Sequence, residues 1–394
     1  MSRVLMHLAL CAIVGGLLAP PAHAAKKAEF TRPPYAGAYE PKGVDERGLW
    51  MESDEDERKI RDFPRIVRDS KLNDYVHGVL CRSVGDDRCS SARIYIVQDN
   101  SFNAEMSPNG MMYVFTGLLV RMHSEAELST VLGHEFAHFE QRHSLKDYRH
   151  RRTGTDIISW IWLAGAATAQ NTSDTRNDIH FSFYSFDRAQ EVEADFLSAK
   201  FVMASPYRLR GAEVWGRMLE EDNATREAQG LRKAYLLYPS ITATHPTNLQ
   251  RLAYYSKMES ELGDVGEDGV DSFRAGLATI LPSLLDDLIK GNPFATADYV
   301  IRSRGEAMGW DGQLYYTRGE LYRLRANPRD LVTARDLFQQ AIAQPDAPPE
   351  SWRGLGLCAM RLGDTVAGKS ALTEYLTRLP AAKDAASIKM VLEN

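Results

Sequence analysis

Residues 124–138 read SEAELSTVLGHEFAH, a segment with the pattern of a capped helix. The Ser124 hydroxyl can accept the backbone N–H of Glu127, whose carboxylate can reach back to the start of the helix, which makes a capping box. An apolar stripe at helical spacing follows, formed by Leu128, Val131 and Leu132. We therefore expect one helix that begins near residue 124 and runs through the histidines at 134 and 138.

The two histidines are four residues apart, so His134 and His138 lie one turn apart on the same face of that helix. Both imidazoles can therefore reach one metal ion. Glu135 stands beside the first histidine, where its carboxylate can face a metal-bound water. The alternative is a surface helix with two solvated histidines.

A metal site of this kind needs a third protein ligand and an open fourth position. A third histidine ten residues after the first would give one known arrangement, but that position is Ser144. The nearest candidate, His143, is one residue short. A carboxylate from a separate helix is the other option.

Acidic residues at helical spacing occur at 191–195, which read EVEAD, within a strongly helical stretch from Arg188 to Met203. Glu191 and Asp195 are four residues apart and share one face. One carboxylate can bind the metal while the other orients a ligand histidine. On spacing alone Glu191 and Glu193 compete for the ligand position.

Together these segments resemble the gluzincin peptidases of the CAAX prenyl protease, Oma and HtpX type. The resemblance covers roughly residues 50 to 262. The matching segments are Asn103-Ala104, Pro108-Asn109-Gly110, Thr116-Gly117-Leu118-Leu119, His134–His138 with Arg142-His143, Glu191-x-x-Ala194-Asp195, and Thr244-His245-Pro246 with Arg251.

The resemblance implies a zinc metalloendopeptidase with one Zn²⁺ per chain. His134, His138 and Glu191 would be the ligands, Glu135 the general base and Asp195 the supporting carboxylate. His245 would lie near the zinc, either as a fourth ligand that holds the enzyme off or as a catalytic residue. Arg251 would be a nearby cation with no assigned role.

The rest of the chain predicts further helices around a small sheet. Arg93–Val97 and Met111–Thr116 are rich in strand formers, and the segment around Asn103 is extended. Either the Asn103 segment or the 111–115 strand could pair with substrate backbone. The expected fold class is mainly α with a small β-sheet, an α+β zincin-type metallopeptidase domain followed by an α-helical tetratricopeptide solenoid.

Residues 294–394 carry two copies of a repeat at the tetratricopeptide spacing. The copies are Tyr315, Gly319, Tyr322, Ala334, Phe338 and Ala341, then Trp352, Leu355, Gly356, Leu372 and Pro380. Within the family, such a tail resembles the BepA-like periplasmic proteases and chaperones. The alternative is a plain helical bundle with no binding role.

The N-terminus predicts an exported protein. Arg3 precedes an apolar run, and Ala22-His23-Ala24 fits a cleavage site, so residues 1–24 are expected to be a signal peptide. The alternative is a short buried helix or an uncleaved anchor. We expect a leader at 25–47, the metallopeptidase domain at 48–262, a helical connector at 263–293 and the repeat domain at 294–394.

Export affects how the cysteines are interpreted. Cys81 and Cys89 bracket a polar loop and are expected to form a disulfide, although two unpaired thiols are the alternative. Cys358 lies in an apolar helical pattern and is expected to be a buried thiol.

Composition limits the partners. A formal net charge of −6 provides no basic face for nucleic acid. The resemblance implies unfolded or misassembled envelope proteins as substrates and the outer-membrane assembly machinery as a partner of the repeat domain. Ile157–Ala169 is too short to cross a bilayer and would form a lid, a peripheral membrane contact or a core helix.

Two rival functions stay open at this point. The protein could act mainly as a chaperone or assembly factor with restrained proteolysis. It could also be a structural zinc protein, but such sites are usually closed by four protein ligands, and Glu135 would then have no purpose.

Overall fold

The computed structural model describes residues 33–35, 39–153, 173–233 and 247–393, with no account of side chains at 173–187. The predicted signal peptide, the 157–169 segment and His245 lie outside these residues. The described part is mainly helical with one three-stranded sheet, which confirms the predicted fold class.

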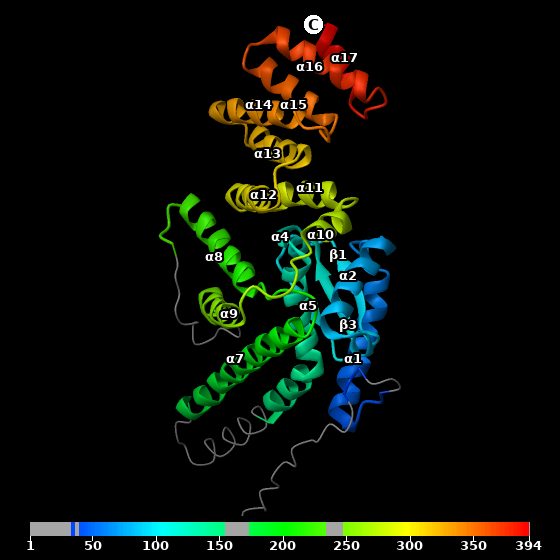
Figure 1. The fold of residues 1–394 in the computed structure, drawn as a ribbon, viewed down its shortest axis with the longest axis vertical. Helices are drawn as coiled ribbons and strands as arrows, with labels where there is room; N and C mark the ends of the chain where they lie inside the picture. Colours follow the sequence, from blue (N-terminus) through cyan, green and yellow to red (C-terminus); the bar gives the residue numbers. More distant parts are fainter. Residues whose placement is uncertain (1–32, 36–38, 154–172, 234–246, 394) are drawn as a thin grey trace, which may run out of the picture. The chain divides into compact units, whose positions relative to one another are not determined.

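Figure 1 shows the order of the elements. The first part contains α1 (Gly43–Arg61), α2 (Ser70–Val84), α3 (Asp86–Cys89), β1 (Arg93–Val97), β2 (Ala104–Met106), β3 (Met111–Phe115), α4 (Thr116–Arg121), α5 (Glu125–Glu140), α7 (Ser173–Met203), α8 (Gly211–Ala228) and α9 (Asn248–Leu262). The second contains α10 (Val270–Leu277), α11 (Leu281–Gly291), α12 (Phe294–Met308), α13 (Gly312–Arg325), α14 (Pro328–Ile342), α15 (Glu350–Arg361), α16 (Thr365–Arg378) and α17 (Ala385–Glu393).

The sheet has the strand order β1-β3-β2. β1 runs parallel to β3 with Arg93 opposite Met111, and β2 runs antiparallel to β3 with Glu105 opposite Tyr113. Both predicted strands are confirmed. Because β3 is paired on both sides, its backbone is not available to a substrate, whereas β2 is an edge strand.

The helix that carries the two histidines is α5, and its cap differs in one detail from the prediction. The Ser124 hydroxyl accepts the Glu127 N–H at 3.2 Å, as predicted. The Glu127 carboxylate accepts the N–H of His123 at 2.7 Å instead of the N–H of Ser124. Arg217 of α8 pairs with the same carboxylate, which accounts for its displacement from the expected position.

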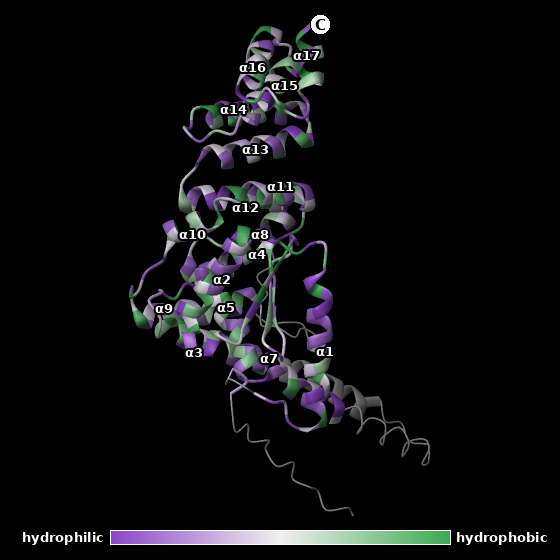
Figure 2. Ribbon diagram, turned by 90° about the vertical axis from the view of Figure 1, so that its right-hand side faces the viewer, coloured by the Kyte–Doolittle hydropathy of each residue, from purple (hydrophilic) through white to green (hydrophobic). Residues whose placement is uncertain are grey.

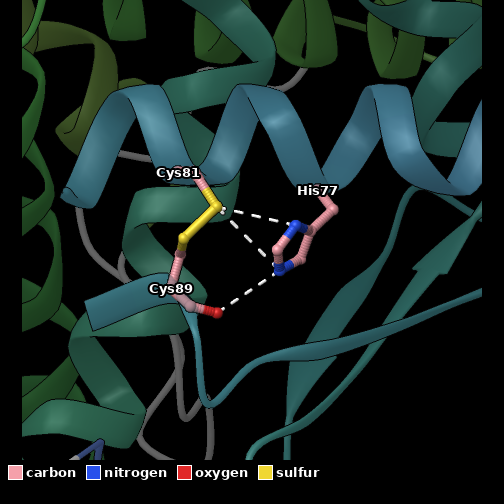
Figure 3. A group of neighbouring side chains, drawn as sticks. All are labelled: His77, Cys81 and Cys89. Carbon is pink, nitrogen blue, oxygen red and sulfur yellow. Dashed lines mark hydrogen bonds between the residues drawn. A yellow bond between two sulfur atoms is a disulfide. The ribbon is translucent and has the colours of Figure 1, made fainter. Parts of the chain in front are cut away.

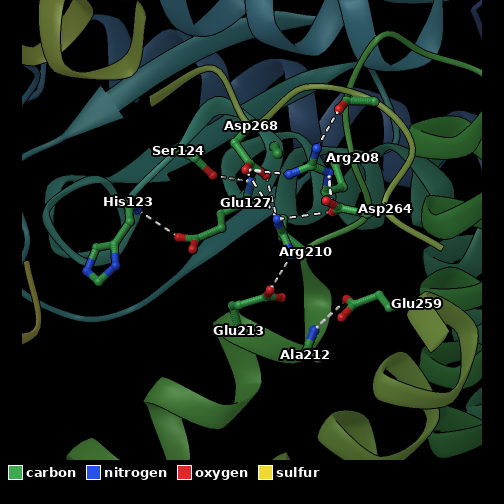
Figure 4. A network of polar contacts seen from close by, with 12 residues as sticks. His123, Ser124, Glu127, Arg208, Arg210, Ala212, Glu213, Glu259, Asp264 and Asp268 are labelled. Carbon is green, nitrogen blue, oxygen red and sulfur yellow. Dashed lines mark hydrogen bonds and ion pairs between the residues drawn. The ribbon is translucent and has the colours of Figure 1, made fainter. Parts of the chain in front are cut away.

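The first turn of α5 is also held by a network of ion pairs (Figure 4). Arg208 and Arg210, which follow α7, both donate to the Asp268 carboxylate, at 2.8 and 2.7 Å. The Asp268 backbone carbonyl accepts the N–H of Ala126 at 3.0 Å. Segments distant in the sequence are thereby joined at the start of α5, and this fixes where the helix begins.

The first described helix, α1, is coloured mostly as hydrophilic in Figure 2. It begins at Gly43, within the segment 25–47 that was expected to be a leader, because the Glu46 carboxylate accepts the Lys42 N–H at 2.7 Å and closes the first turn. Its buried Glu57 accepts two hydrogen bonds from Arg93 of β1, at 2.6 and 2.5 Å. Polar contacts therefore attach α1 to the sheet.

The helices after residue 270 pack as a series of neighbours. The largest hydrophobic cluster continues from Leu72 to Leu321, so α13 shares the core of the sheet and α5. α13 packs against α14, α14 against α15, and α15 against α16, as expected for successive helix pairs. The tetratricopeptide identity and the domain division remain predictions.

The predicted disulfide between Cys81 and Cys89 is present and joins the end of α2 to α3. Cys358 is a free, buried thiol, as predicted. Among the described helices, none is both long and apolar enough to cross a membrane.

Candidate metal centre

Two packed helices, α5 and α7, bring together three potential metal ligands. The Nε2 atoms of His134 and His138 lie 3.1 Å apart. The Glu191 carboxylate oxygens lie 3.5 Å from the first nitrogen and 3.4 Å from the second. All three residues form one cluster whose ligand atoms lie within 4.8 Å of one another.

This donor set fits zinc. Zn²⁺ binds imidazole nitrogen and carboxylate oxygen at about 2.0–2.2 Å in tetrahedral geometry, so two ligand atoms lie roughly 3.3–3.5 Å apart. Two of the three separations in the structure, 3.4 and 3.5 Å, fall within that spacing, and the third, 3.1 Å, is slightly shorter. With zinc bound, two neutral imidazoles and one carboxylate would occupy three coordination positions and leave the fourth for water or substrate.

The approach of the two helices depends on a small residue. A Cβ at Gly133 would lie 3.0 Å from the Ser198 hydroxyl of α7. That hydroxyl donates to the Thr130 carbonyl of α5 at 2.6 Å. The glycine and this hydrogen bond place α7 close enough for Glu191 to reach His134.

The predicted supporting carboxylate, Asp195, orients the first histidine. Its Oδ1 lies 2.9 Å from Nδ1 of His134, so the Nδ1–H donates to Asp195 and the Nε2 lone pair points at the metal position. Asp195 also accepts hydrogen bonds from Arg251, Tyr254 and Tyr255 of α9. Burial opposes its charge, but Arg251 and His134 outweigh burial and hold the pKa of Asp195 well below its usual range.

The second histidine is oriented by a different chain of contacts. Nδ1 of His138 lies 3.0 Å from Nδ1 of His143, and Nε2 of His143 lies 3.3 Å from the Glu193 carboxylate. Burial lowers the pKa of His143 to about 4, so its ring is neutral near pH 7. If its Nε2–H donates to Glu193, its Nδ1 accepts the Nδ1–H of His138, which leaves the Nε2 of His138 free for metal.

The catalytic candidate Glu135 lines a cavity of about 590 Å³ beside the metal position. Edge strand β2 lies on this cavity, and so do Trp215 and Arg251. Burial, together with the neighbouring Glu191 and Glu105 carboxylates, raises the pKa of Glu135 to about 7. Glu135 therefore lies in the cavity with a pKa near neutrality, which suits a general base.

Several residues of this site were missed or left without a role by sequence reasoning. Arg251, Tyr254 and Tyr255 lie within one turn and a half of α9, a spacing that marks one helix face. The Arg251 guanidinium also stacks on Trp215, 3.4 Å from the ring centroid. The helical spacing of Arg251, Tyr254 and Tyr255 can be read from the sequence. It does not show that all three side chains contact Asp195.

The sequence model of peptidase family M48 matches residues 68–259. This segment contains all three residues of the cluster, which lie on α5 and α7. Residues 68–259 form a peptidase family M48 domain. The predicted class of the domain, a metallopeptidase of the HExxH and ExxAD type, is confirmed by this match and by the His-His-Glu cluster.

Curated relatives agree with that family. The "Mitochondrial metalloendopeptidase OMA1" of Schizosaccharomyces pombe is 27% identical over 182 residues, 45% of this chain and 50% of that protein. The "Putative beta-barrel assembly-enhancing protease" of Vibrio cholerae is 29% identical over 148 residues, 35% of this chain and 31% of that protein. The "Protease HtpX homolog" of Moorella thermoacetica is 26% identical over 193 residues, 41% of this chain and 64% of that protein.

The matched segment spans half or less of the first two of these relatives. The similarity therefore covers the M48 domain and gives no information on the helix pairs that follow it. The narrower likeness to BepA-like proteins, drawn from the tail, remains a prediction.

Proposed function

We propose that the protein is a zinc-dependent endopeptidase. The supporting observation is the spacing of His134, His138 and Glu191, whose donor atoms lie 3.1 to 3.5 Å apart beside a cavity that Glu135 lines. A zinc ion held there supplies Lewis acidity and a more acidic bound water. Glu135 is placed to take the proton of that water and return it to the leaving amine.

The substrate is an extended polypeptide segment in this proposal. Edge strand β2 lines the cavity, and an edge strand has unpaired backbone groups that can bind an added strand. Unfolded chains expose their backbone in this way and folded proteins do not. The enzyme would then select unfolded segments because their backbone groups are free to pair with β2.

We further infer that the protein works in the periplasm on unfolded or misassembled envelope proteins. The predicted signal peptide supports export, and the name of the Vibrio cholerae relative, a putative β-barrel assembly-enhancing protease, points to β-barrel assembly. The successive helix pairs from α13 to α16 would hold partners of the assembly machinery.

The experiment that tests the proposed activity is metal removal and return. A chelator followed by dialysis should abolish cleavage of an unfolded protein such as reduced casein, and one equivalent of Zn²⁺ should restore it. Cleavage that persists in the fully metal-free protein would reject the proposal.

The second candidate function is a chaperone with restrained proteolysis, favoured by the series of helix pairs outside the M48 domain. Glu135→Gln separates the two functions because it removes the base and no ligand. If the main role is to bind unfolded proteins as a chaperone, this variant should suppress aggregation of an unfolded client as well as the wild type does.

A further inference from the structure

A second group of side chains that could bind a metal ion lies at the junction of α2 and α3 (Figure 3). It shares no residue with the M48 centre formed by His134, His138 and Glu191. It consists of His77, Cys81 and Cys89, whose nearest donor atoms all lie within 4.8 Å of one another. In the structure the two cysteines form a disulfide. The imidazole beside the disulfide has no part in the chemistry proposed above.

The position of His77 follows from helical spacing. His77 and Cys81 are four residues apart on α2, so their side chains lie one above the other on the same face. Nδ1 of His77 lies 3.6 Å from Sγ of Cys81. This is the same spacing that places two ligands on α5, here with a thiol in place of the second imidazole.

One ring nitrogen of His77 has a hydrogen-bond partner in the disulfide form. Nε2 of His77 lies 3.3 Å from the backbone carbonyl of Cys89. A carbonyl oxygen can only accept, so Nε2 carries the proton and donates. Sγ of Cys81 lies 3.6 Å from Nδ1 and 3.9 Å from Nε2, so it faces the ring edge between the two nitrogens, and the imidazole must turn before the Nδ1 lone pair can share a cation with the sulfur.

We propose that reduction of the Cys81–Cys89 disulfide converts this corner into a binding site for a thiophilic divalent cation such as Zn²⁺. The ligands are Nδ1 of His77 and the two cysteine sulfurs, with the fourth position open to water. This inference is independent of the proposed peptidase function because the two sites share no residue.

The chemistry balances in two steps. A dithiol reductant transfers two electrons and two protons, so that the S–S bond breaks, two Cys–SH groups form and the dithiol becomes a disulfide. Metal binding then releases two protons as both thiols become thiolates. Two thiolates, one neutral imidazole and one divalent cation sum to zero charge, which suits a half-buried position.

The geometry allows both states. The Cα atoms of Cys81 and Cys89 lie 5.1 Å apart. Two thiolates on one zinc, each at about 2.3 Å, lie roughly 3.8 Å apart, so the sulfurs must separate after reduction. Rotation about their Cα–Cβ bonds supplies that separation. The cation would then close the same loop between α2 and α3 that the disulfide closes.

Cobalt is the probe that tests this site, because Co²⁺ bound to thiolate has a sulfur-to-metal charge-transfer band in the near ultraviolet. The M48 centre contains no sulfur ligand and gives no such band. The full-length protein, oxidised or reduced by a non-thiol reductant, is titrated with Co²⁺ without oxygen. The reduced wild type should show the band and one additional metal per chain, and the oxidised wild type should not.

The decisive variant is His77→Gln, which keeps both cysteines and the disulfide. Its reduced form should bind Co²⁺ at this site roughly 10- to 100-fold or more weakly. Cys358→Ser is the matched control, because that buried thiol lies on α15 and its loss should leave the band unchanged.

A measurement on the wild type alone keeps the test valid if His77→Gln misfolds. Bound metal should protect Cys81 and Cys89 from alkylation, located by mass spectrometry, without changing the reactivity of Cys358. A fully reduced wild type without the band would overturn the proposal. So would a band that survives in folded His77→Gln, or one that disappears in Cys358→Ser.

Discussion

Glu191 and Glu193 lie two residues apart on α7 and contact different histidines. The Glu191 side chain is 10% exposed and reaches both His134 and His138. The Glu193 side chain is 52% exposed and contacts His143. The two acids that compete on spacing alone therefore have separate partners in the folded chain.

The first prediction follows from that separation. Glu191→Gln should release the metal on dialysis, because it removes the carboxylate whose oxygens lie 3.5 and 3.4 Å from the two ligand histidines. Glu193→Gln removes an outer partner at a half-exposed position and should weaken metal affinity roughly tenfold at most. Metal content per chain, measured after dialysis, checks both. Loss of metal from Glu193→Gln with retention in Glu191→Gln would reverse the assignment.

The second prediction concerns the buried pair of Asp195 and Arg251. Both side chains are almost fully buried, and removing one partner leaves the other as an uncompensated charge. Asp195→Asn should therefore lower the free energy of unfolding by about 3–5 kcal/mol. The double variant Asp195→Asn with Arg251→Met should cost less than the sum of the two single changes. Additive losses in a denaturant-unfolding cycle would show that the pair is not coupled.

The secondary structure near the site could be predicted from the sequence because its signals are local. The capping pattern at Ser124 and the apolar stripe after it give α5, and β-branched residues give β1. Contacts between distant segments could not be predicted in this way. The link from Asp195 to Tyr254 and Tyr255 depends on how α7 and α9 pack, and the role of His143 depends on the carboxylate of Glu193. The first turn of α1 lies within the segment 25–47 expected to be a leader, and it could not be predicted because it is closed by one polar contact from Glu46 and not by an apolar pattern.

The third prediction tests how α1 is attached. Hydrogen bonds from Arg93, with further donors nearby, lower the pKa of Glu57 to about 2 in the folded protein, below the ordinary value of 4.5. A depressed folded-state pKa contributes stability above the unfolded value that is lost as the pH falls. Glu57→Gln should therefore destabilise the protein by about 1.5–3 kcal/mol at pH 7.

The pH dependence provides the specific check on Glu57. The difference in unfolding free energy between wild type and Glu57→Gln should shrink as the pH falls from 4.5 toward 2. Glu55→Gln, on the exposed side of the same helix, is the control and should leave stability nearly unchanged. A difference that stays constant across this pH range would mean that the charge of Glu57 is not what attaches α1.

The fourth prediction concerns His245, which lies outside the described residues. If it caps the metal in the resting protein, His245→Ala should raise proteolysis and keep the metal on the three remaining ligands. If it instead stabilises the developing oxyanion, the same change should lower kcat roughly 10²-fold or more. We expect the rise. A fall in kcat with full metal content would make His245 a catalytic residue.

The central claim is that Glu135 is the base of a zinc peptidase, and one paired measurement tests it most directly. Metal content and cleavage of reduced casein are measured on the same preparations of wild type and Glu135→Gln. Because Glu135 is not one of the three ligands, the variant should keep one zinc per chain and the wild-type circular dichroism spectrum. Its cleavage rate should fall by about 10²–10⁴-fold. Equal turnover by the two zinc-loaded proteins would contradict the account.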